Sequence, residues 1–157
     1  MLKYCKEKRA SNENLFREAI ENLDIDECYI GYPLLVMMIV KYILNPGAIN
    51  YEKYSENIHE INDGDYQGAL LFLVHKDTYL PESDDYLITT VEYGSCSGCD
   101  TLLNILECMD YDDHEKNRLT KRQVDAIMNL CRDMVVKMKQ PFGFYSKMEE
   151  VEDQPDV

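Results

Sequence analysis

The chain has 157 residues, of which 45% are hydrophobic and 29% are charged, a balance typical of one soluble globular domain. Its 30 acidic residues outnumber its 16 basic ones, so the formal net charge is −14. A surface this anionic repels nucleic-acid phosphates and anionic lipid headgroups, because binding to either requires neutralisation by Lys and Arg. The charge therefore excludes direct binding to nucleic acid or to a membrane surface and favours a partner protein with a basic surface.

The cysteines are not arranged as in a secreted disulfide scaffold. The chain is long enough to bury a core without cross-links, its first residues form no signal peptide, and most of its six cysteines fall within apolar segments. The longest apolar stretch, 29–44, is interrupted by Gly31, Pro33 and Lys41 and is shorter than the roughly 20 residues of a membrane span. These features predict a reduced, cytoplasmic protein.

The first part of the chain predicts three helices. Residues 1–10 form a short basic arm, and a Ser N-cap then opens a helix over residues 11–23. Pro33 suits the first turn of a second helix, which is apolar all round, and therefore buried, and is stopped by residues 45–47. Apolar residues at helical spacing indicate a third, shorter helix within residues 51–61.

The periodicity changes in the middle of the chain, where two strands are predicted. Residues 69–74 are a continuous apolar run, and residues 86–93 are rich in β-branched and aromatic side chains. The connection between them is short, so the two strands should pair antiparallel. A helix then follows over residues 100–109, and a last helix begins at a capping box formed by Thr120 and Gln123. The predicted fold class is α+β, with four to five helices packed on a small antiparallel β-hairpin sheet.

These elements predict one acidic domain over residues 1–147. Half of the residues in the tail, 148–157, are acidic. The tail holds too little apolar surface to offset the conformational entropy that ordering would cost, so it should be disordered. The sequence has no Gly-rich phosphate loop, no triad-like spacing and no calcium-binding loop. We therefore expect no catalytic residue, no metal and no cofactor, and a binding protein is favoured over an enzyme.

The most unusual segment is Cys96-Ser97-Gly98-Cys99, between the second strand and the helix that follows it. A Cys-x-x-Cys at this position is compatible with thiol redox chemistry, because the amides at a helix N-terminus lower the pKa of a thiol. The small central dipeptide would allow the two sulfurs to meet. Two features oppose this interpretation. The neighbouring Asp100 carboxylate would raise a thiol pKa, and a hairpin is not the βαβ unit of a thioredoxin fold.

Three other interpretations of this loop are open. The simplest is that Gly94 and Gly98 form a tight turn requiring positive φ, with the cysteines packed beneath it. The cysteines could also supply half of a zinc site, with Cys108 or His114 as a third ligand, although no second Cys-x-x-Cys completes it. Finally, the loop amides could form a concave nest that binds a carboxylate or phosphate in competition with Asp100. The candidate binding residues are Gly94, Ser95, Cys96, Ser97, Gly98, Cys99 and Asp100.

The string YGSCSGCDTL, residues 93–102, resembles a signature of uncharacterised small bacteriophage and prophage proteins. Residues 64–68 and 130–139 are similar to the same group, so the resemblance covers about the second half of the chain, with the Cys-containing string as its specific element. That group has no established activity. The resemblance therefore implies only a phage-type accessory protein that acts in the cytoplasm of a bacterial host cell.

Acidic residues cluster in several segments, one of which contains Asp110, Asp112 and Asp113. Such clusters usually form a solvated face. In an accessory protein they could instead imitate nucleic-acid phosphates and occupy the basic groove of a host protein. We therefore expect a non-enzymatic accessory protein that binds a host protein and, by imitating nucleic acid, inhibits a defence or DNA-binding protein of the host. The alternative is a small cytosolic thiol-redox or zinc-binding protein that uses Cys96 and Cys99.

Overall fold

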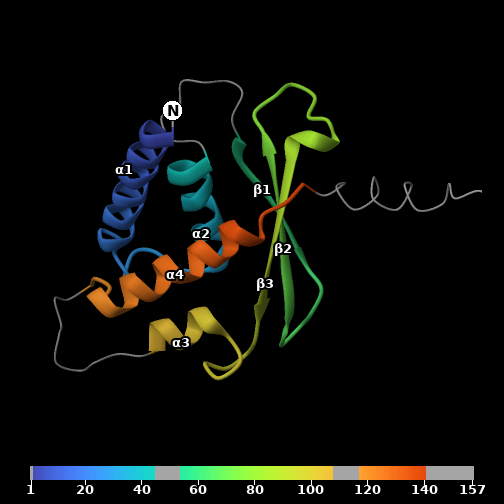
Figure 1. Cartoon of the computed structure of the whole chain (residues 1–157). Helices are drawn as coiled ribbons and strands as arrows, with labels where there is room; N and C mark the ends of the chain where they lie inside the picture. Colours follow the sequence, from blue (N-terminus) through green and yellow to red (C-terminus); the bar gives the residue numbers. More distant parts are fainter. Residues whose placement is uncertain (1, 45–53, 108–116, 141–157) are drawn as a thin grey trace, which may run out of the picture.

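The computed structural model describes residues 2–44, 54–107 and 117–140, and the α+β fold class is confirmed (Figure 1). The predicted acidic tail, 148–157, lies outside the described residues. In chain order the elements are α1 (Leu2–Glu21), α2 (Tyr32–Ile39) with the π-helical turn η1 (Val40–Leu44), β1 (Tyr54–Asn62), β2 (Gly68–Lys76), the 3-10 turn η2 (Ser83–Asp85), β3 (Tyr86–Tyr93), α3 (Thr101–Glu107) and α4 (Lys121–Lys137).

The sheet is an antiparallel meander in the order β1-β2-β3. The central strand β2 pairs with β3 along nearly its whole length, with Gly68 opposite Tyr93 and His75 opposite Tyr86. Both predicted strands and their antiparallel pairing are therefore confirmed. The sheet is larger than the predicted hairpin, because β1 adds a third strand on the other side of β2.

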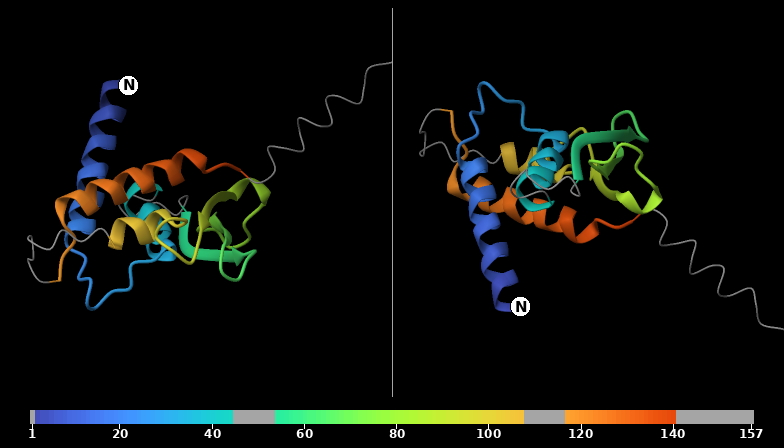
Figure 2. Two further views of the ribbon diagram at one scale, coloured as in Figure 1. Left: turned by 90° about the horizontal axis from the view of Figure 1, so that it is seen from below. Right: turned by 90° about the horizontal axis from the view of Figure 1, so that it is seen from above.

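The helices lie on one face of this sheet (Figures 1 and 2). Alternate side chains of β2, those of Leu70, Phe72 and Val74, are buried against them, as expected for a strand with one covered face. Helix α2 supplies the centre of the core, since five of its eight residues are buried. This helix was predicted to be buried because it is apolar all round, and its burial is confirmed.

The prediction of a helix within residues 51–61 is wrong, since this part of the chain contains the edge strand β1. Ile58 lies on the sheet face that packs against the helices, whereas Ile61, 57% exposed, lies on the opposite face. The register also shifts between Tyr54 and Ile58. Apolar residues on both faces of an irregular strand are spaced three or four apart, which imitates helical periodicity. Pairing with β2 decides the conformation.

Helix α1 begins at Leu2, so the prediction that a helix starts at Ser11 is wrong. The residues before Ser11 include Leu, Lys, Glu, Arg and Ala, which favour helix, and no Gly or Pro separates them from it. Ser11 is therefore an internal residue of α1 and not its cap. Among the described residues, no helix is both long enough and apolar enough to cross a membrane.

The predicted capping box of the last helix is confirmed. The Thr120 N–H donates to Gln123 Oε1 (2.9 Å), and the Gln123 N–H donates to Thr120 Oγ1 (3.3 Å). Gln123 Nε2 also donates to the carbonyl oxygens of Ile105 and Leu106, so the start of α4 is bonded to the end of α3. On the apolar face of α4, Cys131 is 1% exposed, and burial raises its pKa to about 12. It packs as a small hydrophobic residue, as expected.

Candidate functional site

The loop between β3 and α3, residues 94–100, lies at the same end of the sheet as the β1–β2 turn, residues 63–67 (Figure 1). Tyr93, the last residue of β3, joins the two. Its hydroxyl oxygen lies 2.7 Å from Asn62 Oδ1 and 2.7 Å from the carbonyl oxygen of Gly64. The start of the loop is therefore held against the turn by side-chain hydrogen bonding as well as by strand pairing.

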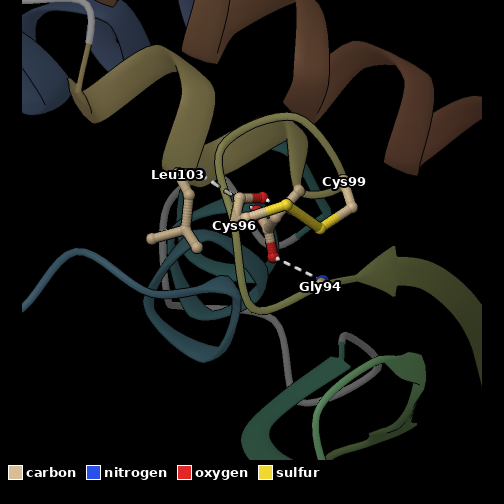
Figure 3. The surroundings of a disulfide bond; sticks show 5 residues. Gly94, Cys96, Cys99 and Leu103 are labelled. Atoms are coloured by element: carbon tan, nitrogen blue, oxygen red, sulfur yellow. Dashed lines mark hydrogen bonds between the residues drawn. A yellow bond between two sulfur atoms is a disulfide. The ribbon is translucent and has the colours of Figure 1, made fainter.

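Cys96 and Cys99 form a disulfide in this loop, with their Cα atoms 5.5 Å apart (Figure 3). The N–H groups of Cys99 and Asp100 both donate to the carbonyl oxygen of Cys96 (3.0 Å each), which closes a single turn and brings the two cysteines together. Both cysteines are exposed. The prediction that they pack beneath the turn is therefore wrong, because the sulfurs pair with each other at the surface.

Asp100 anchors the loop from inside, with only 6% of its surface exposed. Its Oδ1 accepts hydrogen bonds from the Leu103 N–H and from the Tyr32 hydroxyl, both at 3.0 Å. Its Oδ2 accepts one from the Gly94 N–H at 3.2 Å, and Figure 3 shows the bonds to Gly94 and Leu103 as dashed lines. The bond to Leu103 confirms that Asp100 caps α3. One carboxyl group thus connects α2, the end of β3 and the start of α3.

Tyr32 supports this anchor from α2. Burial, together with the nearby Asp100 carboxyl group, raises the pKa of Tyr32 to about 12, although the hydrogen bond from the Leu102 N–H (3.3 Å) acts in the opposite direction. The hydroxyl therefore remains protonated at physiological pH and can donate to Asp100. The sequence contained no signal for this contact, because Tyr32 and Asp100 are 68 positions apart.

Gly94 is needed because Cys99 approaches it closely. A methyl group at Gly94 would lie 2.6 Å from Cys99 Sγ and 2.8 Å from Cys99 Cβ, closer than real side chains pack. A methyl group at Gly98 would meet only Cys96 Sγ, at 3.9 Å. Neither glycine adopts the left-handed backbone conformation, so the prediction that both require positive φ is wrong.

Several N–H groups of the loop and of the start of α3 already have acceptors within the protein. A concave anion site requires successive N–H groups directed at an external ligand. In this loop they donate instead to the Cys96 carbonyl, the Asp100 carboxyl or the Tyr32 hydroxyl; these are the N–H groups of Gly94, Cys99, Asp100, Leu102 and Leu103. These five N–H groups are therefore not available to an anion, and a nest formed by the other loop amides stays a prediction.

Zinc binding is not tested by these contacts. Within the part of the chain that the structure describes, no three His, Cys, Asp or Glu side chains are grouped so that they could hold a metal ion. Cys108 and His114, the predicted third ligands, lie outside that part. Three predicted binding residues of the acidic cluster lie outside it as well: Asp110, Asp112 and Asp113.

One surface depression adjoins the disulfide and a second lies beyond it, and neither was predicted from the sequence. One, of about 260 Å³, is lined by the loop and α3 and includes Cys99, Thr101 and Ile105. The other, of about 490 Å³, shares Thr101 and Ile105 and extends between β3 and α4, where Glu92 lines it. A molecule that reacts with the disulfide would therefore meet the first depression at Cys99.

The described residues thus combine an exposed disulfide, a buried carboxyl group that anchors its loop, and a depression beside Cys99. These are the elements of a site that could react with a thiol without unfolding. Comparison of the chain with protein-family models, with curated proteins and with solved structures finds no match in any of the three.

Proposed function

We propose that this chain is a thiol–disulfide protein whose Cys96–Cys99 pair exchanges with the thiols of another molecule. The observation that carries the proposal is the position of the disulfide, which is exposed on both cysteines and lies in a loop anchored from within by Asp100. In the reducing cytoplasm that the composition predicts for this chain, a disulfide is usually transient and serves catalysis or redox sensing.

The exchange proceeds in two displacements. A partner thiolate attacks one sulfur of the Cys96–Cys99 disulfide, so that this S–S bond breaks, a mixed disulfide forms and the other cysteine leaves as a thiolate. A second partner thiolate then attacks the partner sulfur of the mixed disulfide, which releases the first cysteine. The two cysteine thiolates take up the two protons that the partner thiols lost. The chain gains two electrons, and the partner thiols are oxidised to a disulfide.

The loop should keep its shape through this cycle. The disulfide closes only a four-residue ring, so its loss removes about 2 kcal/mol of loop-closure stabilisation. The hydrogen bonds of Asp100 to Gly94, Leu103 and Tyr32 do not depend on the S–S bond. We therefore expect the reduced protein to remain folded, with two thiols exposed at the surface.

The test is a redox titration of the purified protein in glutathione or dithiothreitol buffers. We expect two thiols per chain to become reactive toward an alkylating reagent on reduction and to be lost again on oxidation, with the far-ultraviolet circular dichroism unchanged. The double variant Cys96→Ser/Cys99→Ser should stay folded, melt at a lower temperature and lose this titration, whereas Cys131→Ala should retain it. Stoichiometric zinc, or unfolding on chelation, would instead support the zinc-binding alternative.

Capture of a basic host protein is a second proposal, and the charge distribution favours it. No Lys or Arg occurs between Asp77 and Glu115, a segment that contains β3, the Cys96–Cys99 loop and α3. This is the accessory role that the resemblance to phage proteins implies, with a defence or DNA-binding protein of the host as the inhibited partner. Exposed carboxylates would attract such a partner over roughly one Debye length, about 8 Å at physiological ionic strength.

For this second proposal we expect binding to weaken steeply with salt and a nucleic-acid competitor to displace the chain. Charge reversal at Asp110, Asp112 and Asp113 should slow association more than it speeds dissociation, as measured by surface plasmon resonance with the captured partner, because exposed charges act mainly on encounter. A partner with an acidic contact surface, or binding that is indifferent to salt and competitor, would contradict carboxylate-driven capture.

A further inference from the structure

We infer that the thiol partner of the Cys96–Cys99 pair carries positive charge beside its reacting sulfur, as does a cysteine flanked by Lys or Arg in a basic polypeptide. The inference rests on the proposed thiol–disulfide function and adds the class of substrate. It follows from three exposed carboxylates that two separate parts of the chain place at the end of the sheet where the disulfide loop begins: Asp63, Asp65 and Glu92.

Glu92 is the exposed carboxylate nearest the disulfide along the chain. Cys99 contacts the backbone position of Gly94, and Glu92 precedes Gly94 by two residues on β3. At the rise of an extended strand, two residues correspond to about 7 Å. Glu92 is exposed and also lines the depression that adjoins the loop. The backbone of Glu92 therefore lies on the order of 10 Å from Cys99.

The β1–β2 turn adds two more carboxylates at the same end of the sheet. Asp63 Oδ1 accepts a hydrogen bond from the Ala69 N–H at 2.6 Å, and Ala69 is paired with Glu92 in the neighbouring strand. Asp65 lies in the same turn, which Tyr93 holds against the start of the loop through its hydroxyl. The register of β2 and β3 thus brings two acidic segments together at the end of the sheet where the disulfide loop begins.

Few cations oppose this charge. The segments that carry these carboxylates contain no Lys or Arg, since none occurs from Tyr54 to His75 or from Asp77 to Glu115. Among the described residues that line the adjoining depression, Lys137 of α4 is cationic, and it shares that depression with Glu92 and Asp133. The local charge around the loop is therefore negative.

A thiolate that approaches this loop is repelled unless a cation beside it offsets its charge. At about 10 Å in water, one unit charge changes the local concentration of another by about twofold at low ionic strength. Each carboxylate at about this distance should therefore enrich a cationic reagent by roughly twofold and deplete an anionic one by a similar factor, and the effects of several carboxylates multiply. Glutathione, which is anionic, should react slowly, and a basic cysteine peptide should react fast.

The experiment measures reduction of the Cys96–Cys99 disulfide in the full chain by three small thiols of similar size: cysteamine, 2-mercaptoethanol and 2-mercaptoethanesulfonate. Each second-order rate constant is divided by the fraction of thiolate at the working pH. At about 10 mM ionic strength we expect cysteamine to react at least tenfold faster than the sulfonate. In 1 M NaCl the ratio should approach one, because the Debye length falls from about 30 Å to about 3 Å.

The charge-neutralised variant Asp63→Asn/Asp65→Asn/Glu92→Gln should lower the low-salt ratio to about twofold or less. The matched control Glu18→Gln/Glu21→Gln/Asp77→Asn removes the same charge from exposed positions on α1 and at the far end of β2, and it should keep the wild-type ratio. Equal rate constants for the three thiols, or an equal loss of the ratio in both variants, would overturn the inference and leave the thiol–disulfide function intact. Failure of all three thiols to reduce the disulfide would overturn the function itself.

Discussion

Replacing Asp100 by Ala is expected to lower the free energy of unfolding by about 4 kcal/mol, measured by urea denaturation under oxidising conditions. The variant leaves three donors without their acceptor in the interior: the N–H groups of Gly94 and Leu103 and the hydroxyl of Tyr32. An unsatisfied buried donor costs about 1–3 kcal/mol, and water can reach only some of these groups. Helix α3 also loses its cap.

Two further variants bracket this effect. Asp100→Asn keeps one acceptor oxygen but presents an NH₂ group to the remaining donors, so we expect a loss between those of the wild type and the Ala variant. Thr101→Ala changes the exposed neighbour and should alter stability by less than about 0.5 kcal/mol. If Asp100→Ala unfolds at the same urea concentration as Thr101→Ala, the buried carboxyl group does not anchor the loop.

Replacing Gly94 by Ala is expected to destabilise the protein by about 2–3 kcal/mol, because the added methyl group would lie 2.6 Å from Cys99 Sγ. To relieve this overlap, Cys99 must move away from the backbone of Gly94, which also disturbs the disulfide. We therefore expect a lower melting temperature and, at a fixed ratio of reduced to oxidised glutathione, a smaller fraction of disulfide-bonded protein. Calorimetry and alkylation of free thiols measure the two quantities.

Gly98→Ala is the matched control within the same loop. Its methyl group would meet only Cys96 Sγ, at an ordinary van der Waals distance of 3.9 Å, and Gly98 does not adopt a positive φ. We expect stability to stay the same or to rise by about 0.4–1 kcal/mol, because Ala restricts the unfolded chain. Equal losses in the two variants would show that the loop requires glycine for backbone freedom, and that close packing against Cys99 is not the cause.

The elements with strong local signals were determined by the sequence itself. The capping box of Thr120 and Gln123 joins neighbouring residues, so its hydrogen bonds depend little on the rest of the fold. The apolar run of β2 and the β-branched run of β3 are each long enough to show their period without a partner. The loop at Cys96 was also identified from spacing alone, because Cys-x-x-Cys beside two glycines is visible without a structure.

Only the tertiary structure determined that the two cysteines form a surface disulfide and that Tyr32 and Asp100 anchor their loop. The cysteines pair at the surface because the N–H groups of Cys99 and Asp100 close a turn on the Cys96 carbonyl oxygen, and Asp100 holds that turn against the rest of the fold. The anchor of the loop depends on Tyr32, which reaches Asp100 only because α2 packs against the start of α3. Such contacts join distant residues and leave no period or spacing in the sequence.

The conformation of β1 and the charge around the disulfide were decided in the same way. The spacing of Ile58 and Ile61 is compatible with a helix, and only the hydrogen-bonding edge of β2 makes the extended form more stable for this segment. The register that places Gly68 opposite Tyr93 then brings Asp63 and Glu92 to one end of the sheet. Strand register depends on which faces are buried against the helices, and local sequence does not contain that information.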